Sequence, residues 1–205
     1  MKKYITEFIG TFFLVLVIGL SGNPLAIGSV LMVMVYMGGH ISGAHYNPAV
    51  TLALLMRKKI GSTEAIIYMV FQVIGAILAA LFVYLLTKQT FGPAPKEGYN
   101  ILKPLFIEGA FTFALASVVL NVAATKATSG NSYYGLAIGF TVLAGAVAGG
   151  PISGGAFNPA VGIGPLIVDQ AFAGSGNISN IWIYMVGPFA GGAVAALVHG
   201  FTSPE

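Results

Sequence analysis

The sequence of 205 residues contains no cysteine, so neither a disulfide framework nor a thiolate metal site is possible. Charged side chains are scarce: they make up 7% of the chain, against about 25% in a soluble domain. Hydrophobic residues make up 57%, and the mean hydropathy is +0.88. The polar surface needed to face water is missing, which predicts a protein that lies in a lipid bilayer. The net charge of +3 is too small to indicate nucleic-acid binding.

Groups that carry catalysis are also missing. The three histidines, His40, His45 and His199, fit no metal-ligand spacing. The sequence has no carboxylate pair in a cleft pattern and no phosphate-binding loop. We therefore expect no enzyme activity, no catalytic residue, no metal and no cofactor.

What the sequence does contain is long apolar stretches. A helix needs about 20 residues to cross the hydrocarbon core of a bilayer. Six stretches are predicted to do so: Tyr4–Leu20, Leu25–Gly39, Glu64–Leu86, Pro104–Ala124, Tyr133–Gly149 and Ile178–Phe201. Two shorter apolar segments, Pro48–Met56 and Pro159–Val168, can cross only half a bilayer. They are predicted to be re-entrant half-helices, because irregular backbone beside them can line a watery cavity.

The tripeptide Asn-Pro-Ala occurs twice, as Asn47-Pro48-Ala49 and Asn158-Pro159-Ala160. Each copy follows a Ser-Gly pair by a few residues and is directly followed by Val. One copy could arise by chance and be a simple capped helix start. Two copies in the same setting, each before a half-length apolar segment, indicate a duplicated membrane channel.

Other matches in the same order support the duplication. Glu7 corresponds to Glu108, and Gly75–Leu81 corresponds to Gly191–Leu197. A three-span unit used twice must be inverted in the membrane, because its number of spans is odd. The expected fold is an all-α membrane protein with six transmembrane helices, two re-entrant half-helices and an inverted three-span repeat. We expect one channel domain over residues 1–205, with repeats at about 1–86 and 104–201 and a linker at 87–103.

Basic residues favour one orientation. With both termini in the cytoplasm, six of the nine Lys and Arg residues lie inside, in agreement with the excess of positive charge on that side of membrane proteins. The inside set is Lys2, Lys3, Arg57, Lys58, Lys59 and Lys126, and the outside set is Lys88, Lys96 and Lys103.

The paired motifs predict a pore. Proline is favoured at the first position of a helix and asparagine just before it, so Asn47 and Asn158 should each cap a half-helix. The inverted repeat makes the two N-termini meet near the midplane, each with about half a positive elementary charge. Side-chain amides there can donate hydrogen bonds to a water or alcohol oxygen, while a cation meets two positive dipole ends.

The segments before the motifs are rich in glycine and should expose a row of backbone carbonyls toward the pore. These carbonyls replace the hydrogen bonds that a solute loses when it leaves bulk water. The residues expected to supply them are Gly43, Ala44, His45, Gly154, Gly155 and Ala156. The opposite wall is expected to be apolar.

The chain resembles the aquaporin family, also called major intrinsic proteins, over nearly its whole length. The resemblance rests on Glu7, Gly39–Thr51, Gly135–Gly139, both Asn-Pro-Ala motifs and Gly187–Gly192. It implies a channel for water in a lipid bilayer and a homotetramer with one pore per subunit.

The family also has an outer constriction of four positions, typically aromatic residues and an arginine. By the resemblance these positions are Ile27, Ala146, Gly155 and Val161. The arginine is therefore replaced by Val161, and Val161-Gly162 stands where glycerol facilitators usually have Arg-Asp. The second motif region is more similar to tonoplast intrinsic channels. A neck of small or aliphatic groups implies passage of water and of small neutral solutes such as urea, ammonia, glycerol or hydrogen peroxide.

Glu7 and Glu108 lie inside apolar spans, where a carboxylate is normally paired. They could form a proton relay, which would make the protein a proton-coupled carrier. They could instead brace the half-helix loops by accepting backbone hydrogen bonds, and the resemblance favours this role. A carrier would also need charged groups at the midplane, where the neutral Asn47 and Asn158 are expected.

Four more residues carry secondary expectations. Gln72 is expected to link helices. His45 is expected to brace its loop, with a pH sensor as the alternative. Tyr184 and Trp182 are expected to anchor the last span at the membrane interface.

The absence of cysteine gives a first testable prediction. Mercuric chloride blocks pores by binding a thiol, so it should not change the water permeability of liposomes that contain this protein. Stopped-flow light scattering with and without the mercurial measures this directly. Rapid and strong inhibition would contradict the expectation.

Overall fold

The computed structural model describes residues 1–174 and 177–203. In these residues the chain folds into eight α-helices and two short 3-10 helices. The α-helices are α1 (Lys2–Ser21), α2 (Pro24–Ser42), α3 (Pro48–Met56), α4 (Ser62–Thr87), α5 (Leu102–Ala123), α6 (Tyr134–Ser153), α7 (Pro159–Phe172) and α8 (Ile181–Thr202). The 3-10 helices are η1 (Lys126–Thr128) and η2 (Asn177–Asn180). All six expected spans and both half-helices are present.

Some helix ends differ from the expectation for local reasons. The helix α2 begins at Pro24 because the Asn23 side chain accepts hydrogen bonds from the N–H groups of Leu25 and Ala26. The half-helix α7 continues four residues past Val168, and the carbonyl of Asp169 then accepts the N–H groups of two residues that follow the helix. The first residues of the last expected span form η2, and α8 itself starts at Ile181.

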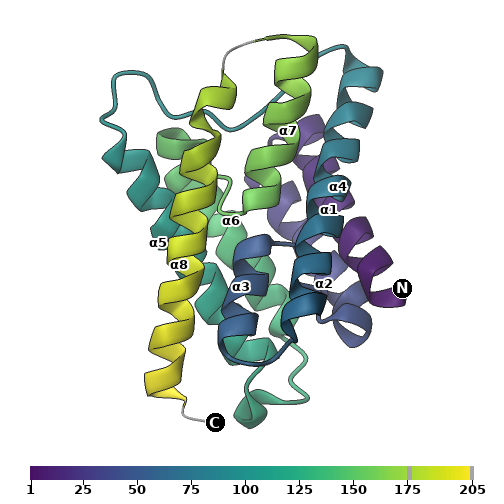
Figure 1. Cartoon of the computed structure of the whole chain (residues 1–205), viewed down its shortest axis with the longest axis vertical. Helices are drawn as coiled ribbons and strands as arrows, with labels where there is room; N and C mark the ends of the chain where they lie inside the picture. Colours follow the sequence, from purple (N-terminus) through teal and green to yellow (C-terminus); the bar gives the residue numbers. More distant parts are fainter. Residues whose placement is uncertain (175–176, 204–205) are drawn as a thin grey trace.

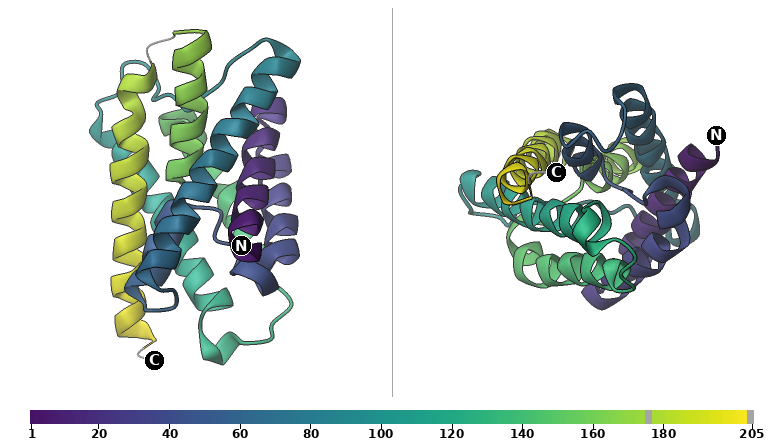
Figure 2. Two further views of the ribbon diagram at one scale, coloured as in Figure 1. Left: turned by 45° about the vertical axis from the view of Figure 1, so that its right-hand side comes forward. Right: turned by 90° about the horizontal axis from the view of Figure 1, so that it is seen from below.

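The two half-helices enter the bundle from opposite ends. In Figure 1, α3 occupies the lower half of the molecule and α7 the upper half, and their first residues point toward the centre. The long helices surround them: α1 packs on α4, α5 packs on α8, and α2 packs on α6. Residues 88–101 form no helix and connect α4 to α5, within the linker expected at 87–103. The first residues of α1 lie in the lower half of the molecule, and α8 ends at its lower end (Figures 1 and 2).

Glycine allows the paired helices to approach closely. A Cβ atom at Gly75 of α4 would lie 2.6 Å from the carbonyl oxygen of Phe8 in α1. At the equivalent crossing, a Cβ at Gly191 of α8 would overlap the carbonyl oxygen of Gly109 in α5. Side chains larger than hydrogen are therefore excluded at both crossings, as is common where membrane helices pack.

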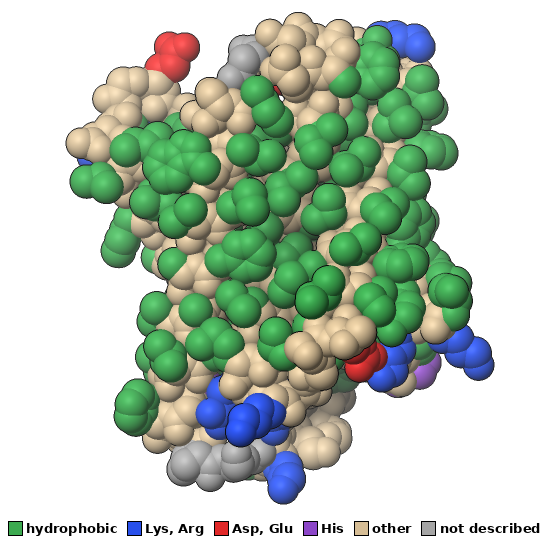
Figure 3. All heavy atoms as spheres, in the orientation of Figure 1, with side chains coloured by type: hydrophobic (Ala, Val, Ile, Leu, Met, Phe, Trp, Pro, Cys, Tyr) green, Lys and Arg blue, Asp and Glu red, His purple; other side chains and the backbone are tan. Residues whose placement is uncertain are grey.

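The outer surface of the bundle is apolar. Six helical segments are long and hydrophobic enough to cross a membrane, and large side chains such as Phe106, Ile66 and Leu86 are exposed on them. Figure 3 shows hydrophobic side chains over the middle of the visible face and most of its Lys and Arg side chains near the lower end. Such a surface is stable in lipid and not in water, so the chain is an integral membrane protein.

The glycine crossing yields a stability prediction. Gly191→Ala should lower the melting temperature of the detergent-solubilised protein, because the added methyl group must push α8 away from α5 at a cost of about 1–3 kcal/mol. Gly150→Ala is the matched control, since a Cβ there meets no atom within 4 Å. Equal melting temperatures for the two variants would show that α5 and α8 can move apart to accommodate the methyl group without loss of stability.

Candidate functional site

The segments that precede the two half-helices have the same backbone shape. Gly43 and Gly154 have φ values of 87° and 91°, and Tyr46 and Phe157 both have φ of 49°. Left-handed φ values are unfavourable for residues with side chains, at about 1–3 kcal/mol each. Both segments must therefore be held in place by their surroundings.

Glu7 of α1 holds the first segment. Its Oε1 accepts the His45 N–H at 3.0 Å, and its Oε2 accepts the Tyr46 N–H at 2.7 Å. The Ser42 hydroxyl donates to Oε1 at 2.6 Å, and Gln72 Nε2 donates to Oε2 at 2.8 Å. Each hydrogen bond of this kind contributes about 0.5–1.5 kcal/mol, so together they offset the cost of the left-handed turn.

Glu108 of α5 does the same for the second segment. Its Oε1 accepts the Ala156 N–H at 3.0 Å and the Ser153 hydroxyl at 2.7 Å, and its Oε2 accepts the Phe157 N–H at 2.6 Å. Both carboxylates are fully buried. Because Glu7 and Glu108 accept main-chain N–H groups, the carbonyls of the same peptides are free to face elsewhere.

A serine and a tyrosine support each carboxylate, and no role was predicted for these residues as a set. The Ser42 hydroxyl accepts the Ala44 N–H, and Tyr68 of α4 donates to the Ser42 carbonyl at 2.8 Å. In the second half, the Ser153 hydroxyl accepts the Gly155 N–H, and Tyr184 of α8 donates to the Ser153 carbonyl at 2.6 Å. The Ser-Gly pair before each Asn-Pro-Ala motif is the sequence feature that could have indicated the role of the two serines.

The expectation that Tyr184 anchors the last span at the membrane interface is wrong. It is fully buried, whereas Trp182 is 41% exposed. The two side chains lie on different faces of α8, because residues two apart in a helix do not share a face.

The first half has further polar contacts that the second half lacks. The Thr51 hydroxyl donates to the Asn47 carbonyl at 3.0 Å, and it lies 3.0 Å from both His45 Nδ1 and Gln72 Nε2. His45 and Gln72 thus join α3, α4 and the first segment.

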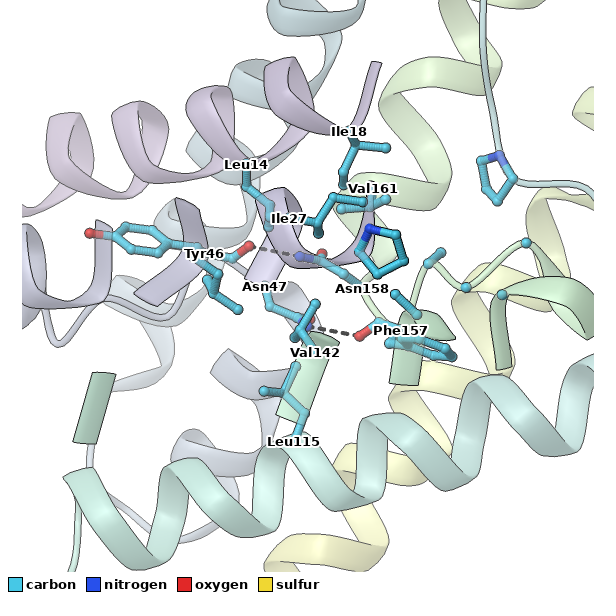
Figure 4. A pocket seen from close by; sticks show the side chains of 18 of the residues that line it. Leu14, Ile18, Ile27, Tyr46, Asn47, Leu115, Val142, Phe157, Asn158 and Val161 are labelled. Carbon is cyan, nitrogen blue, oxygen red and sulfur yellow. Dashed lines mark hydrogen bonds between the residues drawn. The ribbon is translucent and has the colours of Figure 1, made fainter. Parts of the chain in front are cut away.

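The two asparagines meet across the centre of the bundle. Asn47 Oδ1 accepts the Ala49 N–H at 2.8 Å, and Asn158 Oδ1 accepts the Ala160 N–H at 2.9 Å, so each caps its half-helix. Asn47 Nδ2 donates to the Phe157 carbonyl and Asn158 Nδ2 to the Tyr46 carbonyl, both at 2.9 Å (Figure 4). Each asparagine therefore caps its own helix and binds the other half.

A cavity of about 340 Å³ opens beside this pair. One side is formed by the two loops, with His45, Asn47 and Asn158 among its lining residues. Figure 4 shows aliphatic side chains around the asparagine pair: Leu14, Ile18, Ile27, Leu115, Val142 and Val161. Among the described residues, no Asp, Glu, Lys or Arg lines this cavity.

The structure brings most of the expected site residues to this cavity. The four residues expected at the constriction, Ile27, Ala146, Gly155 and Val161, all line it. Of the residues expected to supply carbonyl groups to the pore, Ala44, His45, Gly154, Gly155 and Ala156 line it as well. Gly43 instead lines two further cavities of about 370 and 290 Å³, and the smaller of these shares His45 and Val119 with the central cavity.

The structure also adds lining residues that the sequence did not indicate. Phe91, Gly92 and Pro93 of the linker line the central cavity. Their approach depends on contacts with distant parts of the chain, so no local signal could have revealed it.

Comparisons with known proteins assign the chain to a family and support its fold. A family model described as major intrinsic protein matches residues 1–199. The chain is 38% identical to a glycerol uptake facilitator protein-like 6 of Lactiplantibacillus plantarum, over 96% of this chain and 95% of that protein. It is 35% identical to aquaporin TIP2-3 of Arabidopsis thaliana, over 98% of this chain and 86% of that protein. The X-ray structure of the aquaglyceroporin from Plasmodium falciparum has a similar fold, with a TM-score of 0.87 and 21% sequence identity. The match covers 99% of this chain and 97% of that chain.

The carboxylate contacts predict the effect of Glu108→Gln. A glutamine amide offers one acceptor oxygen in place of two, so either the Phe157 or the Ala156 N–H loses its acceptor, at about 1–3 kcal/mol. We expect a lower melting temperature and lower water permeability per inserted protein. Glu97→Gln, at an exposed linker position, is the control. A variant as stable and permeable as the wild type would show that the loop needs only one acceptor oxygen.

Proposed function

Because this chain belongs to the major intrinsic protein family of membrane channels, we propose that it conducts water and small neutral solutes passively. Urea, ammonia, glycerol and hydrogen peroxide are the solutes in question. The observation that carries the proposal is the pair Asn47 and Asn158 at facing half-helix starts, in a cavity that no charged residue lines among those described.

We propose that permeation follows the polar side of the cavity. Each asparagine uses one Nδ2 hydrogen for the opposite loop and keeps a second for a passing oxygen. The loop carbonyls accept hydrogen bonds from the same solute, and the aliphatic side adds none. A molecule is thereby solvated without being held tightly, which favours flux over binding.

Exclusion of ions is part of the proposal. The starts of α3 and α7 each place about half a positive charge near the asparagines. A cation that enters the cavity loses its hydration shell and meets both dipoles, while the aliphatic wall offers no compensating charge. Protons that move along a water chain meet the same barrier.

The carrier hypothesis has less support. Neither Glu7 nor Glu108 is among the described residues that line the central cavity. Their carboxylate oxygens accept hydrogen bonds from the main-chain N–H groups of the two loops. A carrier would accumulate solute against its gradient when a pH gradient is imposed. A channel would only equilibrate solute, and a flux assay with and without a pH gradient separates the two.

We propose that the lower end in Figure 1 faces the cytoplasm and that four copies assemble, as the resemblance implies. Clustered basic residues support the orientation, since Arg57 lies at this end and donates to the carbonyl of Ser203 near the C-terminus. Protease access in oriented vesicles and cross-linking in the membrane test the two statements separately.

Val161 gives the sharpest test of solute range. Val161→Arg should reduce glycerol and urea permeability far more than water permeability, because a long cationic side chain narrows the neck and fixes a donor there. Val161→Met is the control for length without charge. Stopped-flow light scattering on proteoliposomes measures all three rates. If the wild type conducts water alone, the neck is narrower than these residues suggest.

A further inference from the structure

The linker between α4 and α5 reaches the channel. In Figure 1 it crosses the upper end of the molecule, where α7 ends. Three of its consecutive residues, Phe91, Gly92 and Pro93, line the central cavity together with Ile27 and Val161. A connecting loop that only joined two helices would not need to enter the wall of the cavity.

Two hydrogen bonds fix this part of the linker, which we name the strap and define as Thr90–Lys96. At one end, the Thr90 hydroxyl donates to Oδ1 of Asp169 in α7 at 2.7 Å. At the other end, the Lys96 N–H donates to the carbonyl of Ile152 in α6 at 3.1 Å. Asp169 is only 5% exposed, so its bond to Thr90 is shielded from water.

The strap also fits the channel in shape. A Cβ at Gly19 of α1 would lie 2.6 Å from Cζ of Phe91, so the ring occupies space that exists because residue 19 is glycine. A Cβ at Gly154 would lie 2.6 Å from the Ala94 nitrogen and 2.9 Å from the Pro93 Cβ. Gly154 precedes Gly155, one of the expected constriction residues, so the strap packs directly on the loop that forms the neck.

We propose that the strap is a wall of the outer neck and sets the upper size of permeating solutes. The four expected constriction residues are small or aliphatic and leave space there, and Phe91 and Pro93 occupy part of it from outside the bundle. The inference rests on the proposed channel function, and it assigns size selection to residues that lie in neither repeat.

The first test removes the ring. Phe91→Ala should raise the ratio of glycerol to water permeability several-fold, with little change in water permeability, because the neck widens while the asparagine region is untouched. Glu97→Gln, in the same linker but beyond the strap, should keep the wild-type ratio. A Phe91→Ala ratio equal to that of the wild type overturns the proposal.

The second test does not depend on a cavity-forming variant. The chain has no cysteine, so Pro93→Cys carries a single thiol. Mercuric chloride should strongly reduce the water permeability of Pro93→Cys and leave Glu97→Cys unchanged. An unblocked Pro93→Cys shows that the strap does not border the water path. Wild-type proteoliposomes no more permeable to water than empty liposomes would instead overturn the channel function itself.

Discussion

The rest of the structure depends on the need to satisfy backbone polar groups where no bulk water is available. In a bilayer an unpaired N–H or C=O group costs several kcal/mol, which is why helices dominate membrane proteins. The segments at 43–47 and 154–158 break this pattern at the centre of the bundle. They can do so because Glu7 and Glu108 accept the N–H groups and leave the carbonyls for the cavity. The polar side of the channel is thus a by-product of how the helix break is stabilised.

The sequence predicted the features that depend on local chemistry. Asparagine before proline marks a helix start with little ambiguity, so α3 was predicted to the residue and α7 at its first residue. Properties that depend on which way a helix faces were harder to predict. Tyr184 was assigned to the membrane interface because aromatic residues near span ends often lie there, yet it faces Ser153 inside the bundle. The strap was missed because Thr90 and Asp169 are 79 residues apart.

The two halves share a framework but differ in what surrounds it. Both have the glutamate, serine and tyrosine that hold the loop. Only the first half adds His45, Thr51 and Gln72. The Thr51 hydroxyl contacts the other two side chains and donates to the Asn47 carbonyl, and Gln72 also donates to Glu7. The second half has Ala156 where the first has His45, and it relies on fewer side chains. The cavity consequently has a histidine on one side of the asparagine pair and an alanine on the other, so the path is chemically asymmetric despite its symmetric backbone.

The crossed bonds of the asparagines have a consequence for how the protein is made. Asn47 binds a carbonyl 110 residues later, and Asn158 binds one 112 residues earlier. Chains are synthesised from the N-terminus, and contacts between distant residues form late. The first loop therefore leaves the ribosome before its partner for the crossed hydrogen bonds has been made. These bonds can form only after the second half has been inserted with the opposite orientation. An error in the insertion of either half therefore leaves both crossed hydrogen bonds at the middle of the bundle unformed.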